Sequence, residues 1–600
     1  MTTLYSDIKS YITTQESAFK TWINLPGGWK WSMREHIELS YLYNNSQLST
    51  GKDDFKPVEN ITRPLLNLQH RTEDIDLKDV QIYLDDPEKY HLSFLIKKYH
   101  DDVFVLENDL DTFFDELNVS RIDYGGGLSK TTKDFREVVQ LHSIAFCDQT
   151  DLLSGPIGIK HFFSPSQLQE MERNGWGNPK NGATNSIEET ILLARQGKEE
   201  AQTEISNDTP GKYIEVYEVH GDMPNRFINP EDQSEKFSYQ MHIVAFYTSK
   251  NGKKECITLF KSEEKENPFK LVKRDPVYGR ALGFGGAEEL FEAQVWTNYD
   301  MIRMQDMLDA AAKTVMLTND KQLAARHPKG LKDLDNMEFL YEEVNGNTRQ
   351  LDTFPRNMAL FEKSKAHWKE HAGDIAASQP ALEGKEAPSG TPFAAIQAQI
   401  QQGMGLHDYR RGQFAKHIEE IYRDDFIPKM VKEITKGTRF LAELSMDEME
   451  FVAEGMANCY INKATINAWM KGNLPSKEER EAVRIAYKEQ FKKGGNKKFI
   501  EILKGELKDI EVKVKVNVAG KQKNLVGIVD KMSNLVRFVF STYNPQTQSF
   551  AALDDPRIAK WMNQINELSG LEPMDFSVSP APKPVVAPPE MQPNPQPVNA

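Results

Sequence analysis

The chain has 600 residues, of which 27% are charged and 39% hydrophobic, and its formal net charge is −15. A chain of this length is too long to fold around one hydrophobic core, so we expect several domains. No apolar run reaches the ~20 residues that span a bilayer. The charge argues against a surface that grips nucleic acid by neutralising phosphates. The net charge is compatible with a negatively charged surface past which DNA slides without adhering.

The three cysteines are isolated from one another in the sequence, at Cys147, Cys256 and Cys459. Their odd number and wide spacing exclude a disulfide framework and a cysteine zinc site. We expect them to stay reduced, as in a protein made in a cytoplasm.

Residues 1–120 predict helices joined by polar connections. Helical patterns cover 8–23, 33–46 and 86–117. From Asn118 the pattern changes, and NVSRIDYGGGLSK is interpreted as strand and turn. Two later helices begin with capping boxes, in which a serine and a residue three positions on bind each other's backbone N–H groups. These boxes are Ser164 with Gln167 and Ser186 with Glu189.

An alternating pattern predicts a small antiparallel β module over about 212–262. Ile214 and Val216 share one face of YIEVYEVHG. The segments FSYQMHIVAFYTS and KKECITLFKSEE predict a hairpin closed by Asn251-Gly252, a pair that favours two-residue turns.

The most informative stretch runs from Tyr278 to Thr318. After several glycines it predicts one helix over 287–317, roughly 45 Å long at the usual rise per residue. Its apolar residues fall on several faces, Trp296 and Met304 among them. Such a helix is expected to be contacted from several sides.

A compact tip, a second helix and a third follow in that order. Residues 319–352 predict short apolar pieces and turns. Pro355 starts the second helix, where Phe361, Trp368 and Ile375 recur every seven residues. A loop rich in small residues covers 379–392. The long helix over 393–436 should kink at Pro428.

The C-terminal part, 437–572, is predicted to be mainly helical. Within it, the alternating IEVKVKVNVAGK predicts one strand. Residues 573–600 include eight prolines in the last 21 residues, which predicts a polyproline-like or disordered tail.

Catalytic and metal motifs are not found in the sequence. It contains no HExxH or CxxC, and the loop Tyr124–Thr131 lacks the glycine that precedes lysine in a phosphate loop, so we interpret it as a glycine turn. His367 and His371 lie four apart on the second helix, but the only carboxylates at readable spacing, Glu370 and Asp374, fall on the neighbouring face, so we interpret the two histidines as a solvated or subunit-facing pair. Arg410 and Arg411 are interpreted as salt-bridge residues. We therefore predict no catalytic residue, no metal ligand and no cofactor.

The order of these elements resembles that of the portal proteins of tailed double-stranded DNA bacteriophages, from about residue 210 to 440. Two stretches carry the resemblance. The first is RDPVYGRALGFGGAEELFEAQVWTNYDMIRMQDMLDAAAKTV, and the second is TPFAAIQAQIQQGMGLHDYRRGQFAKHIEEIYRDDFIPKMVKEI. The fold implied is a predominantly helical α+β subunit with wing, stem, clip, tunnel loop and crown.

The resemblance implies the following division. The wing would be 1–276, stem helix 1 would be 277–318, the clip 319–352 and stem helix 2 353–378. The tunnel loop would be 379–392, the kinked wing helix 393–436, the crown 437–572 and the tail 573–600.

The resemblance also implies a structural role without enzymatic activity. Such a chain would form a ring, expected to be a dodecamer, at one capsid vertex of the virion, after synthesis in the host cytoplasm. The ring would pass double-stranded DNA during packaging and ejection. Its partners would be the major capsid protein, the terminase large subunit and then the head–tail adaptor, and no membrane.

Two sets of site residues follow from this reading. The channel loop would approach DNA through Lys385, which lies between Glu383 and Glu386. Contacts between subunits would come from stem residues, and two of these, Trp296 and Met304, should be buried only when neighbours are present. The whole set is Trp296, Tyr299, Met304, Phe361, Trp368 and Ile375.

Two alternatives stay open at this point. One is another virion ring, such as a head–tail connector, although those chains are usually much shorter. The other is a helical cytosolic enzyme whose site the sequence does not reveal.

Overall fold

The structure, a computed structural model, describes a defined subset of the chain. These residues are 7–46, 59–77, 80–84, 90–133, 135–200, 214–231, 236–249, 253–312, 315–325, 338–341, 349–350, 358–378, 393–436, 446–473, 475–487, 512–516, 534, 537, 541, 543–544 and 549–550. The chain divides into two compact units, Met1–Lys521 and Gln522–Ala600. In the second unit, β16 (Tyr543–Asn544) pairs with β17 (Ser549–Phe550).

The fold class is α+β and predominantly helical, as predicted. The first helices are α1 (Ile8–Phe19), α2 (Met33–Asn44), α3 (Thr62–Thr72), α4 (Tyr90–Tyr99), the π-helix η3 (His100–Phe104), α5 (Val105–Glu107) and α6 (Leu110–Tyr124). A short hairpin of β1 (Ile23–Asn24) and β2 (Lys30–Trp31) joins α1 to α2. No helix among the described residues is both long enough and apolar enough to cross a membrane.

One prediction for this part of the chain is wrong, and another is correct only in its second half. The helix predicted over 86–117 is interrupted by η3 and by Asp109, whose φ is 48°. The segment predicted as strand and turn from Asn118 is helical up to Tyr124, because α6 continues to bury Asn118, Arg121 and Ile122, and its strand begins at Gly126. Gly125 ends the helix with a φ of 81°, in the left-handed conformation that glycine adopts readily.

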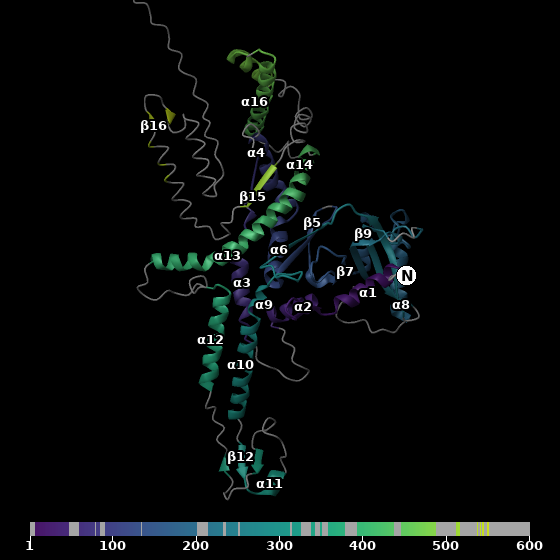
Figure 1. Cartoon of the computed structure of the whole chain (residues 1–600), viewed down its shortest axis with the longest axis vertical. Helices are drawn as coiled ribbons and strands as arrows, with labels where there is room; N and C mark the ends of the chain where they lie inside the picture. Colours follow the sequence, from purple (N-terminus) through teal and green to yellow (C-terminus); the bar gives the residue numbers. More distant parts are fainter. Residues whose placement is uncertain are drawn as a thin grey trace, which may run out of the picture. The chain divides into compact units, whose positions relative to one another are not determined.

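Two antiparallel sheets follow α6 (Figure 1). The smaller has the order β11-β4-β5, from β4 (Gly126–Thr131), β5 (Arg136–Val139) and β11 (Phe269–Lys273). The larger has the order β10-β9-β8-β7-β6, from β6 (Ile144–Phe146), β7 (Ile157–Phe163), β8 (Ile214–Pro224), β9 (Phe237–Thr248) and β10 (Lys254–Glu263). The predicted module is therefore correct in type but begins earlier, at Ile144.

The local predictions in this region are confirmed. Thr248 of β9 pairs with Lys254 of β10, as expected for a hairpin, while Asn251-Gly252 lies outside the described residues. The helices α7 (Pro165–Glu170) and α8 (Ile187–Glu200) precede β8. Both capping boxes form, the first between Ser164 and Gln167 and the second between Ser186 and Glu189.

The predicted long helix is split and shorter than expected. A turn of helix, α9 (Gly286–Glu289), precedes α10 (Phe291–Ala312), and Val315–Thr318 forms strand β12. The β-branched and apolar residues of β12 pair in parallel with β13 (Glu338–Tyr341) and antiparallel with β14 (Arg349–Gln350). Helix α11 (Lys321–Ala325) lies between β12 and β13 in the chain, and α12 (Met358–Ile375) follows β14.

The long helix changes type just before Pro428, while the predicted kink itself stays a prediction. Helix α13 (Phe393–Ile421) passes into the π-helix η8 (Tyr422–Phe426) and then α14 (Ile427–Lys436). Proline lacks an N–H and clashes with the carbonyl of residue i−4, which favours a local change of helix type here. Helix α16 (Met446–Met470) follows, and β15 (Val512–Val516) pairs with β3 (Val80–Leu84).

One hydrophobic core joins α4, α6, α13, η8 and α14. Its centre is aromatic, with Phe104, Phe114, Tyr422 and Phe426 all almost fully buried. Phe114 stacks on Tyr422 with ring centroids 6.1 Å apart. The C-terminal half of α13 is therefore anchored by apolar packing.

Candidate functional site: a helix pair and its ionic joint

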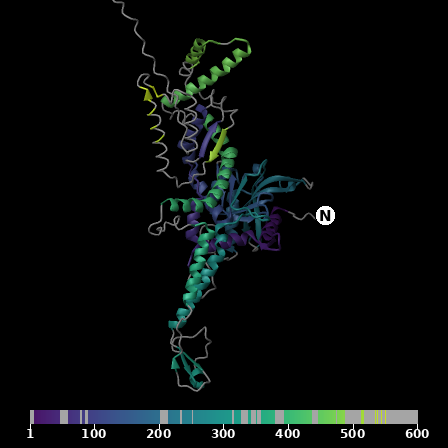
Figure 2. The ribbon, with the colours of Figure 1, turned by 60° about the vertical axis from the view of Figure 1, so that its left-hand side comes forward.

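Helices α10 and α12 lie side by side, as Figures 1 and 2 show from two directions. The indole of Trp296 stacks on that of Trp368, with centroids 6.0 Å apart and planes at 11°. Further along α10, Arg303 lies over the ring of Phe361. As residue numbers increase along α10, those of the contacted residues in α12 decrease, so the helices are antiparallel, as predicted.

Helix α10 buries several polar side chains and leaves several large apolar side chains exposed. The buried residues include Gln294 (1% exposed), Thr297 (0%), Asn298 (6%) and Asp300 (5%). The exposed large apolar residues are Phe291 (40%), Trp296 (43%), Tyr299 (44%) and Leu308 (44%). Buried polar residues and exposed apolar residues are the informative departures from the usual pattern. Trp296 and Tyr299, whose ring centroids lie 5.9 Å apart, therefore form an exposed apolar pair with the composition of a contact surface.

Gln294 shows why α10 buries polar side chains. Its Oε1 accepts hydrogen bonds from the backbone N–H groups of Ile61 (2.8 Å) and Thr62 (3.1 Å), at the N-terminus of α3. Its Nε2 donates to the carbonyl of Glu59 at 2.7 Å. Ile61 offers no side-chain cap, so Gln294 caps α3 from a helix distant in the sequence.

The predicted stem residues have different environments in the single chain. Trp296 and Tyr299 are largely exposed, whereas Phe361, Trp368 and Ile375 are half-buried. Met304 is only 8% exposed, so the prediction that it becomes buried only beside neighbours is wrong: the chain already covers it. Glu383, Lys385 and Glu386 lie outside the described residues, as do 379–392 and 573–600 entirely and much of 319–352.

His367 and His371 remain an exposed pair with stacked rings, 6.4 Å between centroids. In the described part of the chain no group of three His, Cys, Asp or Glu side chains is arranged to hold a metal ion.

The segment that leads into α10 is packed backbone against backbone through glycines. The carbonyl of Gly125 accepts hydrogen bonds from the N–H groups of Arg274 and Gly283, both at 3.0 Å. A Cβ on Gly283 would lie 1.7 Å from the carbonyl oxygen of Arg274. Only glycine fits there, because no side-chain atom tolerates such an approach.

Beside these glycines, four segments meet around Glu73, which is fully buried at the end of α3. Arg121 of α6 donates to Glu73 at 2.9 Å, and Arg274 donates at 3.0 Å. From α13, His407 Nδ1 lies 3.3 Å from the same carboxylate and Arg410 Nη1 lies 3.6 Å from it. We call these five residues, Glu73, Arg121, Arg274, His407 and Arg410, the ionic joint.

Two further carboxylates balance the joint. Arg410 pairs with Asp275 at 2.5 Å and also with Glu289 of α9, and Arg274 pairs with Glu289 at 3.2 Å. Burial alone would raise the pKa of Glu73, but the charges of Arg274 and Arg121 outweigh it and hold the pKa far below its ordinary value. Glu73 is therefore ionised, and the joint fastens the start of the helix pair to α13.

The sequence indicated only part of this joint. The salt bridge between elements expected for Arg410 and Arg411 is confirmed for Arg410, which pairs with Glu289 of α9. Arg411 instead pairs with Asp408 within α13. Glu73, Arg121 and Arg274 were not identified, because no local pattern distinguishes a buried charge from a solvated one.

A second ionic cluster lies between the two sheets. Glu218 of β8 accepts from Lys130 of β4 at 2.9 Å, and from His161 and His220 at 2.9 Å each. The other ring nitrogen of His220 lies 2.9 Å from Glu264. Glu218, His220 and Lys130 are each 5% exposed or less, so the cluster is a staple between sheets and not a site open to substrate.

The geometry of His220 predicts a pH-dependent stability. Both ring nitrogens face carboxylates, which only the doubly protonated imidazolium satisfies. Burial lowers the pKa of His220, but hydrogen bonds to Glu218 and Glu264 outweigh it and leave the pKa raised. A raised pKa stabilises the fold fully below the unfolded value of about 6.5, and this contribution is lost as pH rises through the folded pKa.

We therefore expect His220→Gln to cost roughly 1.5–3 kcal/mol below pH 6, as for hydrogen bonds to charged groups. The difference in free energy of unfolding from wild type should shrink as pH rises above about 6.5, through the raised pKa of His220. Denaturant titrations at several pH values measure it. His371→Gln, an exposed histidine, is the control, and an equal penalty for His220→Gln at every pH would contradict the assignment.

Comparisons with known proteins identify no family. No family model matches the chain, and no curated protein matches it. Among solved structures, a chain from the virion of a native gene transfer agent particle aligns over 90% of this chain and 100% of its own, with 10% identity and a TM-score of 0.27. An overlap at that score carries no weight for fold or function, so the proposals below depend on the residues.

Proposed function

We propose that the chain is the subunit of a portal, a ring at one capsid vertex through which double-stranded DNA enters and leaves a virion. The observation that carries the proposal is α10: a helix that buries polar residues against its own chain and leaves Trp296 and Tyr299 exposed. An exposed apolar pair of this kind favours a neighbouring copy. The other supports are the antiparallel partner α12 and the small sheet between the two helices in the chain.

In this proposal each part has a mechanical task. The pair α10 and α12 is the stem, and the sheet β12–β14 with α11 belongs to the clip that docks the packaging motor and later the head–tail adaptor. The ionic joint transmits load between stem and α13. The net charge of −15 per subunit keeps DNA from adhering to the wall.

Contacts in such a ring are heterologous, and they close only when the rotation per subunit divides the circle. Purified full-length chain should therefore give closed rings with a central hole in negative-stain images and a single large species in sedimentation. Compact monomers or dimers at micromolar concentration would contradict the proposal.

A paired substitution tests the surface itself. We expect Trp296→Ser with Tyr299→Ser to weaken ring assembly at least about tenfold in concentration, equivalent to about 1.4 kcal/mol per contact. Both side chains are over 40% exposed, so the subunit should still fold, although the substitution also removes the stack of Trp296 on Trp368. Phe237→Ser removes a still more exposed aromatic residue (64%) from β9 and is the control, which should assemble normally.

A further inference from the structure

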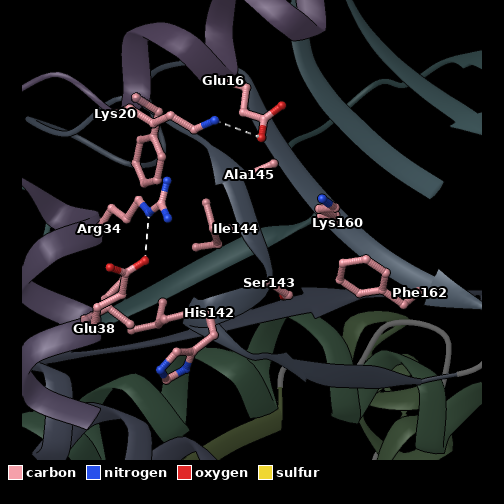
Figure 3. Close-up of a pocket in the computed structure, with 13 residues that line it drawn as sticks. Glu16, Lys20, Arg34, Glu38, His142, Ser143, Ile144, Ala145, Lys160 and Phe162 are labelled. Carbon is pink, nitrogen blue, oxygen red and sulfur yellow. Dashed lines mark hydrogen bonds and ion pairs between the residues drawn. The ribbon is translucent and has the colours of Figure 1, made fainter. Parts of the chain in front are cut away.

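A surface pocket of about 350 Å³ lies between α1, α2, β6 and β7, and none of its lining residues belongs to α10 or α12 (Figure 3). Its floor is apolar and almost fully buried. The floor residues are Phe19, Ile37, Leu141 and Ile144. This volume is at the lower end of the range for ligand pockets and accepts one or two side chains.

Three cations from three different parts of the chain surround that floor: Lys20 directly after α1, Arg34 of α2 and Lys160 of β7. The Nε of Arg34 donates to Glu38 at 2.8 Å, while its two Nη groups have no hydrogen-bond partner among the described residues. Lys20 lies 3.5 Å from Glu16. Lys160 lies 3.5 Å from Glu215 and 4.9 Å from the centre of the Phe162 ring.

The pocket is close to neutral, unlike the chain as a whole. Its lining holds three cations and two carboxylates, Glu16 and Glu38, and Lys160 also pairs with Glu215 beside it, in a protein with a net charge of −15. Acidic segments are repelled by the protein as a whole, so a locally neutral site that offers the two Nη groups of Arg34 would select where one docks.

A backbone feature favours a polypeptide over a small molecule. Residues Ser143, Ile144 and Ala145 line the pocket, and the last two belong to β6. In the described residues β6 is the last strand of its sheet and pairs with β7 alone. An edge strand presents N–H and C=O groups to which an extended peptide can add.

We propose that this pocket docks an acidic segment of a partner protein, which places one apolar side chain on the floor and its carboxylates on Arg34 and Lys20. The free fork of Arg34 suits a carboxylate, since guanidinium and carboxylate form two parallel hydrogen bonds. The apolar anchor selects among acidic segments, and the cations fix its register along β6.

Three labelled pentapeptides test this with the full-length chain by fluorescence anisotropy. Glu-Glu-Leu-Glu-Glu should bind with a Kd of about 0.1 mM, whereas Glu-Glu-Ser-Glu-Glu and Lys-Lys-Leu-Lys-Lys should bind at least about tenfold more weakly. Arg34→Ala and Lys20→Ala should each weaken the acidic leucine peptide by about tenfold. Both side chains are about half exposed, so neither change should disturb folding.

The matched control is Arg173→Ala, an exposed arginine that pairs with Glu170 away from the pocket, and it should leave binding unchanged. Three results would overturn the proposal: no binding of the leucine peptide, equal binding of all three peptides, or binding that ignores Arg34→Ala. If Arg34→Ala instead reduces self-association in sedimentation while the peptide does not bind, the occupant is a second copy and the partner assignment is wrong.

Discussion

Gly283→Ala should be among the most destabilising single substitutions available in this chain. The added Cβ would lie 1.7 Å from the carbonyl oxygen of Arg274, and the neighbour is backbone that is itself hydrogen-bonded to Phe284. The segments around Gly283 and Arg274 cannot move apart without breaking the hydrogen bonds that both donate to the carbonyl of Gly125. We expect the free energy of unfolding to fall by more than about 4 kcal/mol, a size that only severe packing errors reach. The variant should be insoluble or show a large fall in Tm.

Gly412→Ala is the matched control. It lies inside α13, and a Cβ there would meet nothing within 4 Å. Replacing glycine by alanine in a helix interior should stabilise by roughly 0.5–1 kcal/mol. The two substitutions are chemically identical, but their effects on the free energy of unfolding should have opposite signs. Equal Tm values for both variants would show that the glycine-packed contact is not formed in solution.

Those two glycines also show what the sequence could predict. Features encoded by residues close together in the sequence were predicted correctly, as with the capping boxes at Ser164 and Ser186. In each case the interaction closes within a few residues, so local pattern and structure coincide.

Predictions failed where tertiary contacts override local propensity. Asn118 continues α6 because its helix face is buried, and Val315 begins a strand because β13 and β14 offer pairing partners. A helical period in the preceding residues cannot reveal either partner. The helix pair was predicted from order and length, whereas the burial of Met304 by the chain itself was not.

The ionic joint was beyond prediction for the same reason. Glu73 meets Arg121, Arg274 and His407 across 48, 201 and 334 residues of sequence. Among 89 acidic residues nothing local marks Glu73 as buried. Composition can suggest that α13 carries salt bridges, but only the fold shows which carboxylate organises them.

Glu73→Gln should cost roughly 3–5 kcal/mol, because it removes one partner from a buried charged network and leaves the arginines uncompensated. Gln matches Glu in size, so the change isolates charge from packing. Glu170→Gln breaks an exposed pair with Arg173 and should stay within ~0.5 kcal/mol. Denaturant unfolding at pH 7 compares the two variants with wild type.

The pH dependence separates this effect from a simple packing defect. A carboxylate with a depressed folded pKa contributes stability above its unfolded pKa of about 4.3, and that contribution is lost as pH falls towards the folded value. The penalty of Glu73→Gln should therefore be constant from pH 7 to about 5 and shrink at lower pH.

If the portal proposal holds, the same variant should loosen α13 from the start of the helix pair, since Arg274 and Arg410 then lose the carboxylate they share. Amide hydrogen exchange in residues 404–412 of α13 should become faster. Exchange around Phe426 should stay slow, because apolar packing holds η8 in place.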